Sequence, residues 1–248
     1  MKKSFFLTLL IISMFSSCSS EENSTKEASI SLKFTHNWDG AEVTNQDFND
    51  FKFTNSNGEE ISIERLRYLI SNISLVGSEN YTLVDVGENS GGFFAINDLA
   101  PGEYNLSFTF GFSDEDNQDG IYQDLNTANF NVPGMLGSGY HYMQFDGKYK
   151  DNSNLEQPFN YHAIRAVDRS NPNNLVFEDT SFKVDLGTIE VSNDIVIEIK
   201  MNIAEWFKNP NTWDLNQLNT VLMPNFNAQK LMSENGKSVF SLGSITNN

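Results

Sequence analysis

Three histidines are the residues of this 248-residue chain whose type and placement best suit chemistry. Alternation of apolar and polar residues predicts that His36, His141 and His162 each lie on the apolar face of a strand, beside neighbours such as Trp38 and Met143. A buried imidazole needs a hydrogen-bond partner or a metal ion. Two interpretations follow: three separately satisfied core histidines, or three ligands of one ion.

Copper is the metal that this donor set favours. Neutral imidazole combined with methionine thioether suits copper, above all the soft ion Cu(I). Met135 and Met143 are the sulfur donors nearest to the second and third histidines in the sequence. The chain contains no H-x-H or H-x3-H pair, so only the fold can bring His36, His141 and His162 together.

A second candidate metal site is an acidic stretch in the middle of the chain. Glu115, Asn117 and Asp119 offer oxygen atoms at alternating positions before Gly120, as in a calcium-binding loop. The twelfth position of such a loop needs a bidentate acid, and Asn126 stands there instead. A solvated acidic loop is therefore the alternative to a calcium site.

Catalytic motifs do not stand out in the sequence. It contains no G-x-S-x-G, no P-loop and no H-E-x-x-H. Acidic residues are plentiful, but nothing singles out a carboxylate pair for glycoside hydrolysis. We therefore expect a binding protein and not an enzyme.

The single cysteine of the chain follows a short export-like segment. A basic start and the apolar run 5–15 are typical of a secretory signal, and the run is too short to span a bilayer permanently. Ser16-Ser17-Cys18 resembles the lipobox of bacterial lipoproteins, which implies a signal peptide over 1–17 and an acylated Cys18. Residues 18–27 are polar and predict a disordered tether on an outer-membrane lipoprotein, periplasmic or surface-exposed. The alternative is an ordinary signal peptide with an incidental cysteine.

The remaining residues predict one all-β domain over 28–248. Strict alternation, clearest over 30–38, indicates many short, half-buried strands and hence a single β-sandwich, immunoglobulin-like or jelly-roll-like. Short helical turns are expected near the C-terminus at 204–208 and 227–233. The long excursion at 113–139 is expected to be an irregular loop of functional importance.

The charge and the aromatic residues bear on the alternative functions. A net charge of −17 argues against nucleic acid, because phosphate binding needs clustered Lys and Arg. A surface glycan-binding lipoprotein is one alternative, in which exposed aromatic rings would stack on sugars, and a structural or adhesive module is another. The aromatic candidates for glycan binding are Tyr122, Tyr140, Tyr142, Tyr149, Tyr161 and Trp213.

Several short segments, taken in order, resemble a known family. They are 34–36, 67–75, 83–86, 101–104, 108–112, 134–135, 139–140, 146–147 and 159–162. Together these segments resemble the MbnP-like copper-binding family, which is widespread as lipoproteins in Bacteroidetes. The resemblance covers almost the whole predicted domain, from about residue 30 to about residue 240.

The resemblance implies a β-sandwich-like domain in the cell envelope that handles copper without turnover. Family members bind Cu(I) through histidine and a tryptophan oxidised to kynurenine by a partner di-haem enzyme. His36, His162 and Met135 match family positions, and His141 would serve as a third imidazole. A Trp-x-Trp that often follows the Gly-Met of the family is missing here, where 136–138 is Leu-Gly-Ser. An envelope di-haem enzyme or an outer-membrane transporter is the implied partner.

Overall fold

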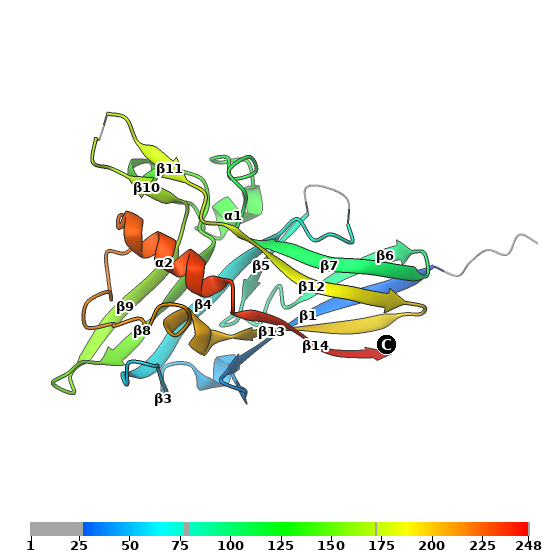
Figure 1. Cartoon of the computed structure of the whole chain (residues 1–248), viewed down its shortest axis with the longest axis horizontal. Coiled ribbons are helices and arrows are strands. Elements are labelled where there is room, and N and C mark those ends of the chain that lie inside the picture. Colours follow the sequence, from blue (N-terminus) through cyan, green and yellow to red (C-terminus); the bar gives the residue numbers. More distant parts are fainter. Residues whose placement is uncertain (1–26, 77–79, 172, 248) are drawn as a thin grey trace, which may run out of the picture.

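The structure is a computed structural model, and it describes residues 27–76, 80–171 and 173–247. The predicted signal peptide and Cys18 lie outside the described residues, as does the predicted tether except for its last residue. Two β-sheets stacked on each other account for most of the described chain, which confirms the predicted all-β sandwich (Figure 1).

The first sheet is built around the N-terminal strand. Its five strands are β1 (Ala28–Trp38), β2 (Ala41–Glu42), β6 (Phe93–Leu99), β13 (Ile195–Asn202) and β14 (Phe240–Asn247). The strand order is β14-β13-β1-β2, and β6 also pairs with β1. The β1–β13 pairing is parallel and runs from Ile30 opposite Ile195 to Asn37 opposite Asn202.

The second sheet is antiparallel and is built around β4. Its seven strands are β3 (Phe51–Thr54), β4 (Glu60–Ser71), β5 (Tyr81–Asp85), β7 (Gly102–Phe110), β8 (Met143–Lys150), β9 (Glu156–Ala163) and β12 (Phe182–Val191). The order is β12-β7-β4-β8-β9, with β3 and β5 also paired to β4. In Figure 1, β8 and β9 occupy the opposite end of the long axis from the beginning of β1.

Short elements complete the fold. They are the hairpin β10 (Ala166–Asp168) and β11 (Val176–Glu178), the helices α1 (Gln123–Thr127) and α2 (Phe226–Gly236), and the 3-10 turns η1 (Asn45–Asp47), η2 (Gly134–Leu136) and η3 (Ile203–Phe207). The turn η3 and helix α2 correspond to the two helical turns expected near the C-terminus. Within the described residues, no helix has the length and apolar character needed to cross a membrane.

The main core lies between the two sheets and follows from the alternation in the sequence. Along β13, Ile195, Ile197, Ile199 and Met201 are buried, and the residues between them are half-buried. Aromatic rings fill much of this core, including Tyr68, which is completely buried. Burial of such large apolar side chains is the main source of stability for a fold of this kind.

The excursion at 113–139 is more ordered than the sequence suggested. It carries α1 and η2, and a second apolar cluster anchors it to the outer side of the β4 sheet. The members of this cluster are Leu69, Phe112, Leu125, Phe130 and Tyr140. Gly139 adopts a φ of +81°, and a Cβ atom there would collide with Asn117. The excursion thus packs as a fixed structure immediately before the segment that carries His141.

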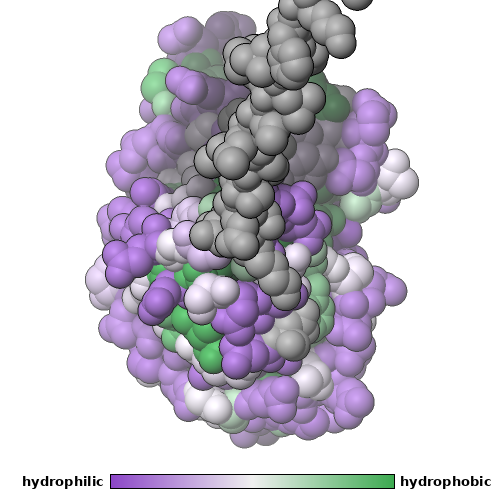
Figure 2. Space-filling view, turned by 90° about the vertical axis from the view of Figure 1, so that its right-hand side faces the viewer, coloured by the Kyte–Doolittle hydropathy of each residue, from purple (hydrophilic) through white to green (hydrophobic). Residues whose placement is uncertain are grey.

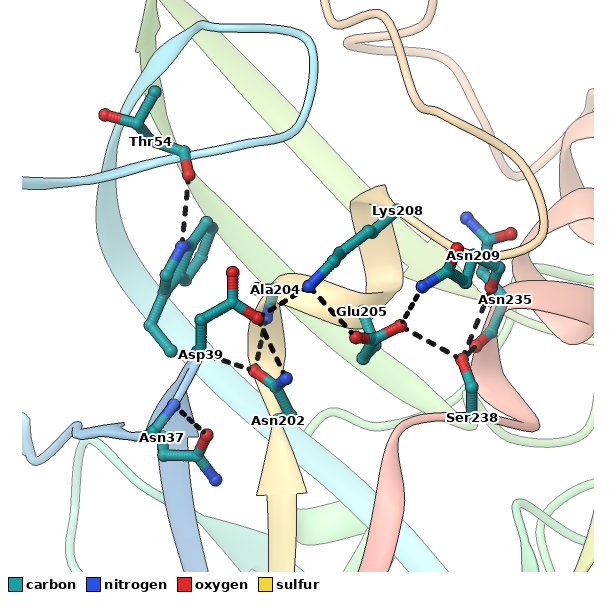
Figure 3. A network of polar contacts seen from close by, with 12 residues as sticks. Asn37, Asp39, Thr54, Asn202, Ala204, Glu205, Lys208, Asn209, Asn235 and Ser238 are labelled. Atoms are coloured by element: carbon teal, nitrogen blue, oxygen red, sulfur yellow. Dashed lines mark hydrogen bonds and ion pairs between the residues drawn. The ribbon is translucent and has the colours of Figure 1, made fainter.

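A polar network ties together the far ends of β1 and β13 (Figure 3). Lys208 Nζ lies 2.8 Å from Asp39 Oδ1 and 3.2 Å from Glu205 Oε1. Asn202 Nδ2 donates to Asp39 Oδ1 at 3.1 Å, and Ser238 Oγ lies 3.4 Å from Glu205 Oε2. Hydrogen bonds from Lys208 and Asn202 lower the pKa of Asp39. The network fixes the parallel pair, η3 and the approach to β14 relative to one another.

The surface agrees with the acidic composition. Figure 2 views the molecule from the right-hand side of Figure 1, and hydrophilic residues cover most of the coloured surface around a small hydrophobic area. With a net charge of −17, such a surface favours solubility and repels polyanions.

Candidate metal site

Two of the three histidines meet on the outer face of the β4 sheet. His141 lies two residues before the start of β8, and His162 is the next-to-last residue of β9. Their ring centroids are 5.3 Å apart, and the rings are nearly perpendicular, at 82°. The antiparallel register of β8 and β9 brings them together, because Tyr142 N donates to Ala163 O at 2.8 Å just before the beginning of β8.

The position of His162 corrects the expected orientation of its strand. Phe159, Tyr161 and Ala163 form the buried face of β9, whereas His162 lies on the opposite face with Asn160. Continuous alternation through 166 had placed His162 with the apolar residues, but β9 ends at Ala163. The residues after the strand therefore do not share its alternation.

Hydrogen bonds fix the proton on each imidazole of the pair. His141 Nδ1 lies 2.9 Å from the carbonyl oxygen of Phe130, and His162 Nε2 lies 2.7 Å from Asp146 Oδ1. A carbonyl or carboxylate oxygen only accepts, so these two nitrogens carry the hydrogen when the rings are neutral. The lone pairs then stand on His141 Nε2 and His162 Nδ1. Both atoms are buried and have no hydrogen-bond partner among the described residues.

Burial also sets the charge of the site. It lowers the pKa of His141 to about 4, which keeps this ring neutral near pH 7. Burial acts to raise the pKa of Asp146, but the hydrogen bond and charge of His162, with Asn160 and Arg65, hold it below its ordinary value. The site thus combines a neutral imidazole with an ionised carboxylate that orients the second ring.

The pair has the donor arrangement of metal-binding histidines. Histidine ligands almost always give their second nitrogen to a carbonyl or a carboxylate, as His141 and His162 do here. A buried nitrogen lone pair without a partner is costly, and a metal ion would satisfy both at once. The two residues therefore fit a metal such as copper, although the described residues contain no group of three or more His, Cys, Asp or Glu side chains that could hold one.

The third histidine lies in a different environment. His36 is on β1 and faces the sandwich interior, where its Nε2 lies 3.0 Å from the Tyr68 hydroxyl oxygen. Burial lowers the pKa of His36 to about 4 and raises that of Tyr68 well above its usual value. The expected convergence of all three histidines does not occur in this structure, and His36 has the contacts of a satisfied core histidine.

Neither predicted methionine points to the pair. Met143 is completely buried on the inner face of β8, and Gln144 occupies the outer face opposite His162. Met135 lies in η2, and its residue surface is 67% exposed. The structure therefore gives no support to either of them as a copper ligand.

The calcium prediction also finds no support in the structure. Asn117 is buried, and its Oδ1 accepts from the backbone N–H of Tyr140 at 2.7 Å. Glu115 and Asp119 are exposed, and neither belongs to a group of potential metal ligands among the described residues. Asn117 instead stabilises the turn that leads into the His141 segment.

The aromatic residues proposed as glycan platforms are mostly part of the core. Tyr140, Tyr142, Tyr149, Tyr161 and Trp213 are all buried. The remaining candidate, Tyr122, is half-buried and stacks against Phe112. Since a sugar needs an exposed ring, these side chains do not offer a glycan surface.

Two residues important to the pair were absent from the sequence prediction. Asp146 orients His162, and Phe130 supplies the carbonyl for His141 and packs its ring against that imidazole. Asp146 is two residues from Gln144, the cross-strand neighbour of His162. The strand register, if known, would have predicted the role of Asp146. The role of Phe130 was not predictable in this way, because every residue has a backbone carbonyl and the sequence does not show which one accepts a hydrogen bond.

Comparison with known proteins decides the family. The MbnP family model matches residues 27–224. The chain belongs to the MbnP family. This result confirms the sequence resemblance and indicates a copper-related protein. Among solved structures, MbnP from Methylosinus trichosporium matches with 11% sequence identity and a TM-score of 0.49, over 76% of this chain and 80% of that chain. No curated protein matches the chain.

Proposed function

We propose that this MbnP-family protein binds copper as Cu(I) between His141 and His162 and acts in metal binding or uptake. The observation that carries the proposal is the pair of buried, unpartnered nitrogens, His141 Nε2 and His162 Nδ1. Phe130 and Asp146 supply the outer hydrogen bonds that hold the rings. The family's link to copper supports this choice of metal.

The site is proposed to hold the metal and not to turn over a substrate. Imidazole binds several transition metals, but Cu(I) is the soft ion that a largely buried site with two neutral nitrogens suits. When bound, copper would complete the coordination of the two lone pairs. The roles of the protein are then to keep His141 neutral, to fix the tautomers of the two rings and to exclude water. The lack of catalytic motifs in the sequence supports a non-enzymatic function.

The location proposed for this function is the cell envelope. The lipobox-like Ser16-Ser17-Cys18 supports anchoring of the protein in the outer membrane through acylated Cys18. We expect Cys18→Ala to release the protein from the membrane fraction and to remove labelling by a fatty acid. A variant that stays membrane-bound and still incorporates the label would contradict the anchor but not the copper site.

The absence of the family's Trp-x-Trp pair affects which envelope partner we propose. Segment 136–138 is Leu-Gly-Ser, so a kynurenine at that place is not available to this chain. We therefore favour an outer-membrane transporter over a di-haem enzyme as the envelope partner. Mass spectrometry of protein purified from its native cells tests this choice, because a kynurenine at any of the three tryptophans of the chain would reverse it.

A direct test of the copper function uses the wild-type protein purified without tags or chelators. Metal analysis should find copper, and added Cu(I) should raise the melting temperature. Stabilisation follows RT ln(1 + [L]/Kd), about 2.7 kcal/mol when free copper is a hundredfold above Kd. Absence of a shift with both Cu(I) and Cu(II) would refute the copper function.

A further inference from the structure

A third potential donor shares a pocket with His162. Asn160, His162, Val221, Leu222 and Met223 line a pocket of about 290 Å³ at the outer face of β9. Met223 contributes the only sulfur atom among these residues, and it is half-buried. Sequence analysis did not select Met223, since it lies far along the chain from all three histidines.

The segment that carries Met223 is tied to β9 at His162. Gln229 is 1% exposed, and its Nε2 donates both to His162 O at 2.9 Å and to Leu222 O at 3.1 Å. Its Oε1 accepts from Ile164 N at 2.7 Å. A single buried amide group therefore holds the backbone just before Met223 against the backbone of the second histidine.

A second set of hydrogen bonds holds the beginning of the same segment. The backbone N–H of Asn160 donates to Asn219 O at 2.8 Å, and Asn219 Nδ2 donates to Pro158 O at 3.3 Å. Residues 219–222 are thus attached to β9 at both of their ends. The position of Met223 is set by the fold and not by a free loop.

The backbone between these attachments is strained. Val221 has a φ of +57° and is 75% exposed. A β-branched residue in the left-handed region is uncommon and costs roughly 1–3 kcal/mol. Such strain persists only where the surroundings impose it, and here it lies at the rim of the pocket that contains His162 and Met223.

The apolar side of Met223 faces the segments that carry the pair. Met223 packs against a small cluster that includes Val132 and Ile164. Val132 is two residues after Phe130, the acceptor for His141, and Ile164 is two residues after His162. Met223 therefore packs against an apolar cluster to which both histidine segments contribute. Methionine has three flexible bonds, so its sulfur adapts readily to a nearby ligand.

We propose that the Met223 thioether is a third ligand of the Cu(I) ion held by His141 and His162. This inference rests on the proposed copper function and adds the residue that selects the oxidation state. A thioether favours soft Cu(I) over Cu(II) and Zn(II), whereas two imidazoles alone bind all three. Leucine has nearly the same volume as methionine, so Met223→Leu would preserve the packing and remove only the sulfur atom.

The test is copper K-edge X-ray absorption on the Cu(I)-loaded full chain. Wild-type protein should show sulfur scattering in addition to imidazole scattering, and Met223→Leu should show imidazole scattering alone. Cu(I) affinity should fall about tenfold or more in this variant, while Zn(II) affinity changes much less. Met135→Leu is the matched control, because Met135 is exposed and should change neither quantity.

The outcomes separate this inference from the copper function itself. Copper bound to wild-type protein through imidazoles without sulfur scattering would overturn the role of Met223 and leave the histidine site intact. Sulfur scattering that persists in Met223→Leu would also overturn it. A wild-type protein that binds no copper would overturn both. If Met223→Leu folds poorly, the same test uses selenomethionine-labelled protein. Copper–selenium scattering that is present in the labelled wild type and lost in Met223→Ile would support the proposal. Absence of copper–selenium scattering in the labelled wild type would contradict it.

Discussion

The environments of His36, which is half-buried, and His141, which is buried, differ in the chemistry of the hydrogen-bond partner. Burial lowers the pKa of both imidazoles to about 4, so both rings are neutral near pH 7. His36 Nε2 meets the Tyr68 hydroxyl, which both donates and accepts and so satisfies that nitrogen in either tautomer. His141 instead meets a carbonyl, which takes its N–H and leaves the other nitrogen without a partner. The nature of the partner thus distinguishes a satisfied histidine from a candidate ligand.

His162 extends the same comparison to a charged partner. The Asp146 carboxylate accepts from His162 Nε2, and the unpartnered Nδ1 is left on the other side of the ring. An unsatisfied buried acceptor costs about 1–3 kcal/mol, so two in one place are a substantial local penalty. A fold retains such a penalty most readily where a ligand removes it.

The strongest way to break this comparison is to remove each histidine in turn. His141→Ala and His162→Ala should each reduce Cu(I) affinity by more than about 100-fold, since loss of a ligand exceeds the effect of losing its outer partner. His36→Ala should leave the affinity unchanged within error. Competition with a chromophoric Cu(I) chelator measures all three variants. Loss of binding in His36→Ala together with retention in His141→Ala would reverse the assignment.

A smaller effect is expected from the residue that orients the second ring. Asp146→Ala should lower Cu(I) affinity by about 10–100-fold, because His162 loses the acceptor that fixes its tautomer. Asn160→Ala is the control, since it removes only a second donor to the same carboxylate oxygen at 2.7 Å. Equal affinities for Asp146→Ala and wild type would show that the carboxylate does not position the ring.

The core histidine makes a prediction about stability that does not involve metal. The pKa of His36 is about 4 in the folded state and 6.5 in the unfolded state, so the unfolded chain binds more protons between these values. The contribution of His36 to stability is therefore complete above pH 6.5 and is lost as the pH falls towards 4.

His36→Gln should reveal this contribution as a difference between two unfolding experiments. Between pH 7.5 and pH 4.5, the free energy of unfolding should fall by about 1–3 kcal/mol less in the variant than in the wild type. Denaturant unfolding of metal-free protein at the two pH values provides the measurement. Identical losses in both proteins would mean that His36 is more accessible to protons than its burial indicates.

Local patterns in the sequence predicted the elements well. Alternation correctly indicated the strand at 30–38, and the Asn-Ser-Asn-Gly sequence at 55–58 is a turn signal that matches the β3–β4 hairpin. Both signals are local, because each depends on side chains that are close in sequence and on the period of a strand. The stretch 65–76 has apolar residues at both helical and strand spacing, and pairing with β5, β7 and β8 makes its first part β4, which ends at Ser71.

The candidate site was predictable only in part, because it depends on strand register. Residue type was sufficient to select His141 and His162, but not to show that they meet while His36 faces Tyr68. Their contact depends on the offset between β8 and β9, and a shift of one residue would turn His162 to the other face. Met223 is still less accessible to sequence reasoning, since a buried glutamine places it.

The parallel pairing of β1 with β13 has a consequence for the order in which the domain assembles. The contact between Ser29 N and Asp194 Oδ1 joins residues separated by 165 positions. During synthesis from the N-terminus, β2 and β6 are the first partners of β1 to become available. The other edge of β1 stays unpaired until β13 has been synthesised. Closing so long a loop is slow compared with forming a hairpin. The first strand to appear is thus among the last to be completed, and its open edge is where helper proteins or misassembly would act during folding.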